Sequence, residues 1–513
     1  MMTALRGDGG WTAAWCAVAL AFPWSNSFMS IATGGLALVA ILSFWRRREG
    51  GSSPAWDLRS GWALVALVVW GGISALWSAD SGLALNDVRV KLPLLVGGLV
   101  LLSRGAFQLP DRGQKAVLHC AAFSAVLASV AVVVLDLADG GGWGGRSASR
   151  FISHIRFGLW WAILLPWLTW GLSRWWGWVS VLSAALVWTW TESVTGLLAG
   201  ILTAGWWLPA LLRPGHSARE AWPSGSTALR RLLWPVAVLS AGFLFLFSAL
   251  PMAKPDAGTL AVSTAYGETY VHRTDRHVME NGHFVWTHLA WGEMAAAWHG
   301  RSEVRFPEVA PRLIRFLSSK GQRKDRDGVL SLTEDEIHAI EGGCVSVVDL
   351  ERGGWYRRWN RFVFNWGQWL DGQETANASI LARSVYQGMA WSAIRHLDGH
   401  ARVLGVGTGG THDALIQAYE RERPEWPPGQ RRRPHNQWLT LWLALGPLGC
   451  VLFGVSMVAA FRRPWGLLGV WILTLSALFE DTLETQAGVT LALWVLALPA
   501  FIQGPQGAAR RRA

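Results

Sequence analysis

Long apolar runs separated by short polar connections make up most of the chain. A bilayer core needs about 20 apolar residues per helix, and runs of about that kind recur roughly twelve times. They lie near residues 8–24, 27–45, 61–78, 89–103, 115–135, 157–173, 175–191, 195–212, 233–251, 436–461, 465–480 and 486–502. No heptad or Gly-X-Y period accompanies them. The pattern predicts an all-α, polytopic membrane protein with about twelve transmembrane helices.

One long polar segment, residues 252–435, interrupts this series. The interruption predicts three regions: a membrane region of about nine helices at 1–251, a large loop domain at 252–435, and a membrane region of about three helices at 436–513. The loop is expected to be mainly helical, because one stretch repeats apolar residues along a single helix face. That stretch contains Ala382, Tyr386, Met389, Ala390, Ala393 and Leu397.

Composition and charge support a membrane location. The 513 residues are 51% hydrophobic and 16% charged, a balance that a single soluble core of this length could not hide from water. The net charge of +11 does not indicate nucleic-acid binding, because the arginines gather between apolar runs, as in Arg46–Arg48 and Arg510–Arg512. By the positive-inside rule these clusters place both termini in the cytoplasm and the large loop in the periplasm of an inner-membrane protein. The four cysteines are too scattered to predict a disulfide or a metal site.

Two short motifs suggest ligands but have simpler explanations. Gly405-Val-Gly-Thr-Gly-Gly410 has the glycine spacing of a dinucleotide turn, yet the second strand and its acidic residue are absent. A tight turn, or a helix start that faces a phosphate, explains it better. Asp325-Arg-Asp-Gly328 resembles part of a calcium loop, but Arg323 occupies the first ligand position. A capping box formed by Thr333 and Glu336 accounts for the residues that follow. No metal or cofactor is predicted.

Polar residues at the ends of five apolar runs are predicted to share one outer rim. Charged groups of both signs around a cavity at the membrane surface would suit a lipid-linked anionic substrate. The candidates are His154, Arg156, Glu192, His435, Asn436, Glu480 and Asp481.

Several motifs resemble the O-antigen ligase and O-antigen polymerase family. Pro434-His-Asn-Gln-Trp-Leu439, followed by Leu445-Gly-Pro-Leu-Gly449, is similar to the signature that opens a late helix in that family. Arg383, Trp391 and the Gly405 turn precede it in the family's order. Ile152-Ser-His-Ile-Arg-Phe157 and Glu480-Asp-Thr-Leu-Glu-Thr-Gln486 are similar to a ligase-like subgroup.

The resemblance implies a metal-independent, inverting membrane glycosyltransferase. Such an enzyme transfers a glycan from a polyprenyl pyrophosphate donor to a sugar hydroxyl of a lipid-linked acceptor outside the cytoplasm, in lipopolysaccharide or surface-polysaccharide biosynthesis. Carried over by motif, Arg383 would bind the pyrophosphate and His435 would be the catalytic base. The second family arginine is replaced here by Ser193-Val194, and we expect Arg156 to substitute for it.

Other roles and other functions stay open at this stage. Asn436 would orient the acceptor, His154 would help to bind substrate, and Glu192 or Glu480 is the alternative base. An O-antigen polymerase would share the chemistry and differ in its acceptor. A polysaccharide or lipid-linked glycan transporter is the alternative of a different class, although no two similar halves with broken helices are evident.

Overall fold

The computed structural model is mostly helical and separates into two compact units. It describes residues 8–45, 54–105, 107–139, 145–212, 226–248, 250–351, 354–373 and 381–502. Unit 1 comprises Met1–Gly141, Gly145–Ser240 and Arg383–Ala513, and unit 2 comprises Gly142–Gly144 and Ala241–Ala382. The arginines at 46–48, 213 and 510–512, which helped to set the expected orientation, lie outside the described residues.

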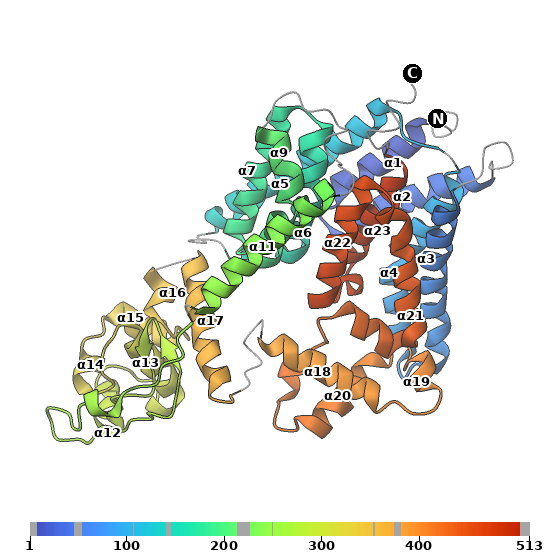
Figure 1. The fold of residues 1–513 in the computed structure, drawn as a ribbon. Coiled ribbons are helices and arrows are strands. Elements are labelled where there is room, and N and C mark those ends of the chain that lie inside the picture. The colour runs from blue at the N-terminus through green and yellow to red at the C-terminus, as the bar shows by residue number, and fades with distance from the viewer. Residues whose placement is uncertain are drawn as a thin grey trace. The chain divides into compact units, whose positions relative to one another are not determined.

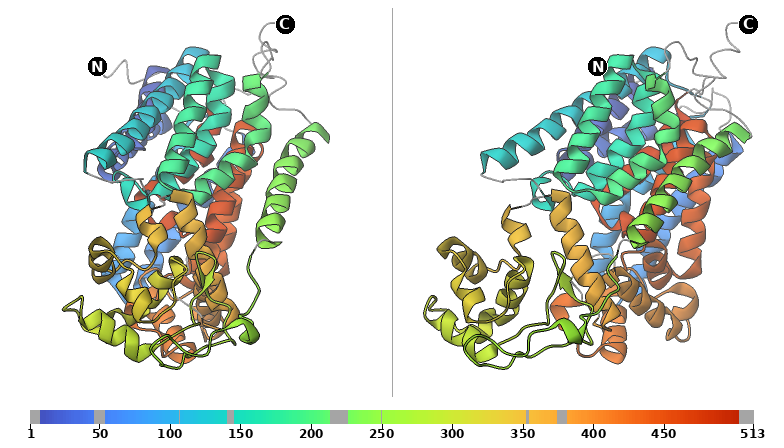
Figure 2. Two further views of the ribbon diagram at one scale, coloured as in Figure 1. Left: turned by 90° about the vertical axis from the view of Figure 1, so that its left-hand side faces the viewer. Right: turned by 60° about the vertical axis from the view of Figure 1, so that its left-hand side comes forward.

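Unit 1 contains the apolar helices (Figures 1 and 2), and α3, α4 and α21 pack side by side within it. Its helices are α1 (Asp8–Ala21), α2 (Asn26–Trp45), α3 (Ala55–Ser74), α4 (Ser81–Ser103), α5 (Asp111–Ala138), α6 (His154–Gly171), α7 (Arg174–Trp190), α8 (Val194–Leu202), α9 (Ala204–Leu212), most of α11 (Ser226–Ser248), most of α18 (Leu381–Arg395), α19 (Ala401–Leu404), α20 (Thr411–Glu422), α21 (Gln437–Phe461), α22 (Pro464–Phe479) and α23 (Gln486–Ala497).

Each apolar run of the sequence coincides with helix in the structure, so the expectation of a mainly helical protein is confirmed, whereas the number of about twelve spans stays a prediction. Within the described part of the chain, four helical segments are long and apolar enough to cross a membrane: Asn26–Trp45, Ala55–Trp77, Asp111–Ala138 and Gln437–Phe461. The run at 195–212 differs from expectation, because α8 ends at Leu202 and α9 begins at Ala204. Between them, the Thr203 hydroxyl donates hydrogen bonds to the carbonyls of Gly200 and Ala162.

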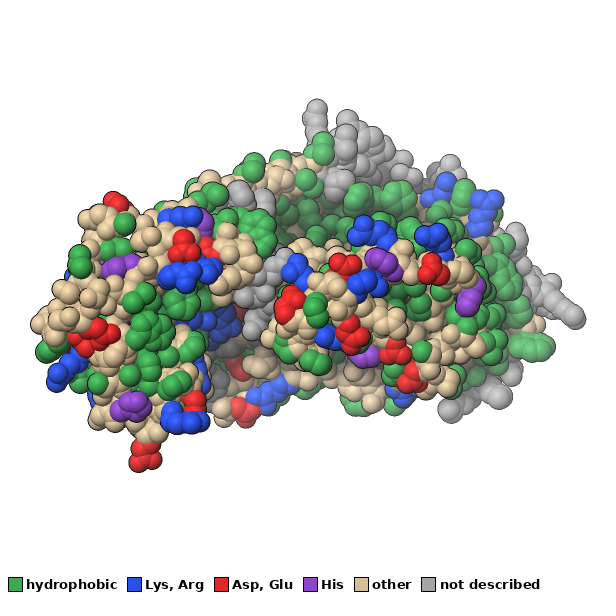
Figure 3. All heavy atoms as spheres, turned by 90° about the horizontal axis from the view of Figure 1, so that it is seen from below, with side chains coloured by type: hydrophobic (Ala, Val, Ile, Leu, Met, Phe, Trp, Pro, Cys, Tyr) green, Lys and Arg blue, Asp and Glu red, His purple; other side chains and the backbone are tan. Residues whose placement is uncertain are grey.

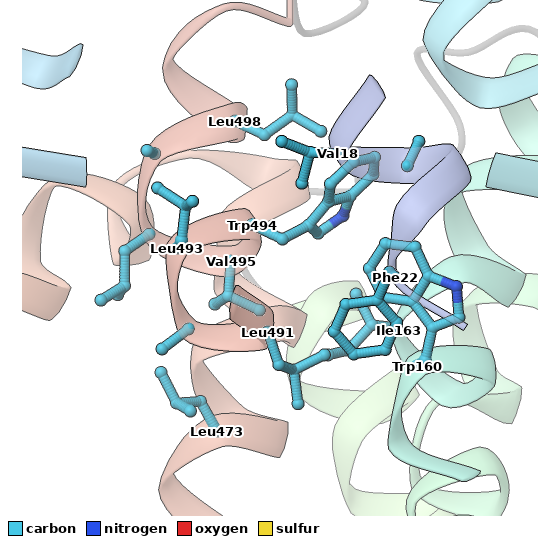
Figure 4. Close-up of a cluster of buried hydrophobic side chains, with 14 of the residues drawn as sticks. Val18, Phe22, Trp160, Ile163, Leu473, Leu491, Leu493, Trp494, Val495 and Leu498 are labelled. Atoms are coloured by element: carbon cyan, nitrogen blue, oxygen red, sulfur yellow. The ribbon is translucent and has the colours of Figure 1, made fainter. Parts of the chain in front are cut away.

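Large aromatic side chains fill the center of unit 1. Trp160 of α6 stacks on Phe22 with ring centroids 4.2 Å apart and meets Trp494 of α23 edge to face at 4.8 Å. Figure 4 shows these rings among leucine, isoleucine and valine side chains that come from α1 and α6 as well as from α22 and α23. Trp160, Phe22 and Trp494 are fully buried. This cluster joins the N-terminal and C-terminal helices, so it fixes the loops at their ends.

The glycine motif at 405–410 is a packing turn. Helix α21 is broken at Gly446, whose φ is 67°, and the following Pro447 has no N–H to bond the carbonyl of Leu443. The N–H of Val406 donates to that carbonyl instead, at 2.9 Å. Gly405 has a φ of 77°, and a Cβ there would lie 2.4 Å from the carbonyl oxygen of Ala444. Glycine is therefore required by the close backbone approach, and the tight-turn interpretation is confirmed.

Unit 2 is a small helical body with one short hairpin. Its elements are β1 (Met279–Glu280), β2 (His283–Phe284), α12 (Trp291–His299), α13 (Phe306–Ser319), α14 (Arg326–Leu330), α15 (Glu334–Glu341), α16 (Val347–Glu351) and α17 (Gly354–Leu370). A core that includes Trp298, Phe316 and Leu317 holds it together. The Thr333–Glu336 capping box is present. Asp325 caps α14, its Oδ1 accepting from the N–H of Gly328 at 2.8 Å, so this side chain helps to close the loop.

The structure divides the expected loop domain of residues 252–435 between the two units. Residues 252–382 belong to unit 2, whereas Arg383 and the residues after it belong to unit 1. The reason lies in the apolar stripe of α18, because Ala390, Ala393 and Leu397 pack against α20 and against Leu443 of α21. The stripe predicted from the sequence is buried at all six of its positions. It attaches the end of the loop to the membrane helices.

Candidate functional site

Three connections of unit 1 place polar side chains at one end of its helices. The segment Arg431–His435 leads into α21, residues 480–485 join α22 to α23, and Ser149–Ser153 leads into α6. Asn436 fixes the start of α21, because its Oδ1 accepts hydrogen bonds from the N–H groups of Trp438 and Leu439 at 3.0 and 3.2 Å. An asparagine at this position is a favourable N-cap. The adjacent His435 is thereby positioned by a defined helix end.

Asp481 holds His435 in an unusual backbone conformation. His435 has a φ of 50°, a left-handed value that costs a non-glycine residue about 1–2 kcal/mol. Oδ2 of Asp481 accepts from the N–H of His435 at 3.1 Å, and Oδ1 accepts from the N–H of Asn436 at 3.2 Å and from the hydroxyl of Thr440 at 2.7 Å. The carboxylate is nearly buried. These three bonds stabilise the strained turn before α21.

His435 and Arg383 both approach Glu480. Nδ1 of His435 lies 3.6 Å from Oε2 of Glu480, slightly beyond hydrogen-bond distance, and Nδ1 is buried without a hydrogen-bond partner among the described residues. Nη2 of Arg383 donates to Oε1 of the same carboxylate. The Tyr386 ring lies beside the imidazole, with centroids 5.7 Å apart. Glu480 therefore joins the predicted base to the predicted phosphate-binding arginine.

Arg156 reaches the same connection from α6. Its Nη1 donates to the hydroxyl of Ser476 and its Nη2 to the carbonyl of Asp481, both at 3.3 Å. The side chain is almost completely buried. The structure thus brings together four residues that the sequence suggested separately: Arg156, Arg383, His435 and Glu480.

A cavity of about 770 Å³ opens beside these residues. This volume lies within the range that small-molecule sites occupy. The cavity is lined by the guanidinium groups of several arginines, by two histidines and by three carboxylates. Figure 3 shows basic, acidic and histidine side chains together over the end of unit 1 that carries α18 and α20. The charged and histidine residues of the lining are Arg150, Arg156, His412, Arg431, Arg432, Arg433, His435, Glu480, Asp481 and Glu484.

The carboxylates of this connection have shifted pKa values. Burial alone would raise the pKa of Glu480, but the nearby His435 ring and the charges of Arg383 and Arg156 lower it overall. Burial raises the pKa of Asp481, opposed by the hydrogen bond from Thr440. Glu480 is therefore the carboxylate favoured as an anion beside the imidazole. An anion in that place can accept a hydrogen bond from Nδ1–H of a histidine and stabilise the protonated imidazole.

A charge network with Glu484 and Lys91 buried at its centre extends from the cavity wall into α4. Oε1 of Glu484 accepts from the Nζ of Lys91 at 3.0 Å, and its Oε2 accepts from Nη1 of Arg433 at 3.2 Å. Lys91 also pairs with Asp87 one turn away. The carbonyl oxygen of the Gln437 side chain accepts from the N–H of Leu483 at 2.6 Å. This network fixes the connection that carries Glu480 and Asp481.

Four of the sequence candidates lie outside the cavity lining. Glu192 is buried in the turn between α7 and α8, with a φ of 51°, and His154 begins α6 with its carbonyl accepting from the hydroxyl of Ser193. Neither belongs to the cavity lining. Asn436 is also outside the lining, and its side-chain oxygen is engaged in capping α21. Arg383 contacts Glu480 from beside the cavity.

Other residues of the site were missed in the sequence. In the sequence Asp481 is one member of the expected outer rim, but nothing there indicates that it would hold His435, and Glu484 and Lys91 are not among the predicted site residues. The available signal was the spacing of three carboxylates at 480, 481 and 484 between two apolar runs. Acidic residues grouped in this way at a membrane boundary usually have partners.

Comparison with known proteins adds no relative. No protein-family model matches the chain, and a search of curated proteins finds none that is similar. Among the residues that the structure describes, no group of three His, Cys, Asp or Glu side chains could hold a metal ion.

Proposed function

We propose that the chain is an O-antigen ligase-like, metal-independent, inverting glycosyltransferase of the inner membrane. In this proposal it crosses the membrane about twelve times, with both termini in the cytoplasm and the large loop in the periplasm. It transfers a glycan from a polyprenyl pyrophosphate donor to a sugar hydroxyl of a lipid-linked acceptor. The observation that carries the proposal is the His435–Glu480 pair on the wall of an arginine-rich cavity.

His435 is assigned as the general base. Its buried Nδ1 faces Glu480, which leaves Nε2 as the nitrogen to take the proton of the acceptor hydroxyl. The distance of 3.6 Å between Nδ1 and Oε2 is compatible with this role, because catalytic hydrogen bonds often tighten only when substrate binds. As the imidazole becomes positively charged, the Glu480 carboxylate stabilises it.

The arginines are assigned to the leaving group. When the acceptor oxygen bonds to the sugar C1, the bond between C1 and the pyrophosphate oxygen breaks and negative charge develops on the phosphate. Preorganised guanidinium groups stabilise that charge most where water is excluded. Arg156 and Arg431–Arg433 line the cavity and can receive the pyrophosphate. Arg383 contributes after exchanging Glu480 for a phosphate oxygen, which frees the carboxylate for His435.

The glycolipid profile of a deletion strain tests this function. If the chain is a ligase, its deletion is expected to leave long glycan on the polyprenyl carrier, while the mature outer lipid lacks that glycan. Carrier-linked glycan that stays one repeat unit long would identify a polymerase instead. Purified protein that moves a lipid-linked sugar between leaflets without making a glycosidic bond would favour a transporter and refute the enzyme assignment.

A further inference from the structure

The start of α3 and the end of α21 lie together in unit 1. The Ser60 hydroxyl of α3 donates to the carbonyl of Val455 and accepts from the N–H of Ala459, both at 3.0 Å. Figure 1 shows the two helices side by side. Both are among the helical segments that are long and apolar enough to cross a membrane. Their shared end, at the opposite end of α21 from His435, is therefore expected at a boundary between lipid and water.

One aromatic ring at this shared end lies against two arginines. The guanidinium group of Arg462, the residue after α21, lies 3.5 Å from the centroid of the Trp56 ring. The guanidinium group of Arg59, one turn further along α3, lies 5.0 Å from the same ring. Both arginines are exposed, and neither forms an ion pair with any residue that the structure describes. Two like charges are thus held close to one ring, an arrangement that a bound anion would stabilise.

The acidic side chain beside this ring, Asp57, is engaged by two other arginines. Oδ2 of the buried Asp57 accepts from Nε of Arg104 at 3.0 Å and from Nη2 of the same guanidinium group. Its Oδ1 accepts from Nη2 of Arg463 at 2.5 Å. Two guanidinium groups on one carboxylate already leave a net positive charge. The charges of Arg59 and Arg462 add to that surplus and are available to an external anion.

Exposed apolar side chains continue from both arginines along their helices. Trp62, one turn after Arg59 in α3, is 62% exposed. On α21, Val451 and Val455 precede Arg462 by eleven and seven residues, a spacing that places them on its face of the helix, and both are exposed. A phospholipid whose phosphate lies at the arginines can place its acyl chains along this surface. A water-soluble anion has no such chains, so the surface favours a lipid.

We propose that Arg59 and Arg462 bind the phosphate of an anionic phospholipid at the end of unit 1 opposite His435. Guanidinium groups donate paired hydrogen bonds to phosphate oxygens, and the Trp56 ring holds both groups in place before the lipid arrives. A zwitterionic lipid also carries a phosphate, but the surplus of positive charge disfavours its ammonium group. An anionic headgroup is therefore preferred. This site is separate from the proposed glycan transfer and does not depend on it.

Native mass spectrometry of the full chain in detergent tests this proposal. The protein is mixed with palmitoyl-oleoyl phosphatidylglycerol or with the phosphatidylcholine of the same acyl chains, and the fraction that retains a lipid is measured. Glycerol 3-phosphate, an anion without acyl chains, is added as a competitor. The test variant is Arg59→Gln with Arg462→Gln. The matched control is Arg112→Gln with Arg174→Gln, which removes the same charge from two exposed arginines at the starts of α5 and α7.

We expect the unchanged protein and the control to retain phosphatidylglycerol in preference to phosphatidylcholine. Retention by the test variant should fall at least about tenfold, the effect of losing one good charge-assisted contact. Equal retention by test variant and control would overturn the proposal, and so would displacement of the lipid by glycerol 3-phosphate, which would indicate a water-soluble ligand. The melting temperature of each protein without lipid shows that it is folded. Arg462→Gln alone is measured in the same way and should also reduce retention.

Discussion

Replacing Asp481 by asparagine is expected to release the backbone turn at His435. The imidazole ring of His435 and the arginines that line the cavity stay unchanged. The amide keeps an oxygen that can serve the N–H of Asn436 and the hydroxyl of Thr440, which both bond Oδ1. It then presents its NH₂ group to the N–H of His435, which in the unchanged protein donates to Oδ2 of Asp481. Two donors cannot bond each other, so the one interaction lost is the one that holds the left-handed turn.

The expected loss can be calculated from that bond. A hydrogen bond to a charged group contributes about 1.5–3 kcal/mol, which is comparable with the cost of the left-handed conformation at His435, about 1–2 kcal/mol. Without the bond the turn should relax and the imidazole should leave its place beside Glu480. Since about 1.4 kcal/mol corresponds to a tenfold change in rate, turnover should fall about 10- to 100-fold.

The assay is transfer of glycan from polyprenyl pyrophosphate to the acceptor lipid by purified protein in proteoliposomes. Thr440→Val is the matched control, because it removes a different bond to Asp481, the one at 2.7 Å, and leaves His435 held. It should cost about 1 kcal/mol of stability and little turnover. A folded Asp481→Asn protein with turnover within about threefold of the wild type, less than 1 kcal/mol, would refute the reasoning.

Three further predictions concern the fold. Gly405→Ala should lower the free energy of unfolding by at least about 2 kcal/mol, because the position has a positive φ and its Cβ would meet the Ala444 carbonyl; Gly429→Ala, with open space around its Cβ, is the control, and equal melting temperatures would contradict the packing turn. Burial and the neighbouring His272 lower the pKa of His288 to about 4, so unit 2 should lose stability as pH falls from about 6.5 to 4, where the unfolded chain binds more protons. His288→Asn tolerates the φ of 54° and should reduce that loss, measured by hydrogen exchange across residues 270–290; an unchanged pH dependence would exclude His288 as its source. Cysteines at Arg305 and Arg112, both exposed, should react differently with an impermeant thiol reagent in spheroplasts, the first labelled and the second protected; the reverse would invert the topology.

The helical architecture was predictable because helix formation and burial depend on local composition. Runs of apolar residues coincide with helices, and the stripe of α18 identified a buried face. The break at Thr203 was not predictable, since the apolar run continues through it. Nor did the sequence indicate that residues from Arg383 onward join unit 1, because this depends on contacts with Leu443, a residue far along the chain.

The site was predictable in its members more than in its geometry. Arg156, His435 and Glu480 lie at ends of apolar runs on one expected side, which is why position alone could group them. The hydrogen bond of Asp481 to the N–H of His435 and the pairing of Glu484 with Lys91 are contacts between distant segments. Nothing in local sequence spacing specifies them. Glu192 and His154 occupy comparable positions in the sequence, yet they do not line the cavity.

The most direct test of the central claim is the transfer step catalysed by His435→Ala protein. Donor binding and glycan transfer are measured on the same proteoliposomes, with wild-type protein and with Arg156→Lys as references. The account predicts that wild-type protein makes the new glycosidic bond, and that His435→Ala still binds the polyprenyl pyrophosphate donor but transfers about 10²- to 10⁴-fold more slowly, the usual contribution of a general base. A folded His435→Ala protein that keeps more than about a tenth of wild-type turnover would contradict the account.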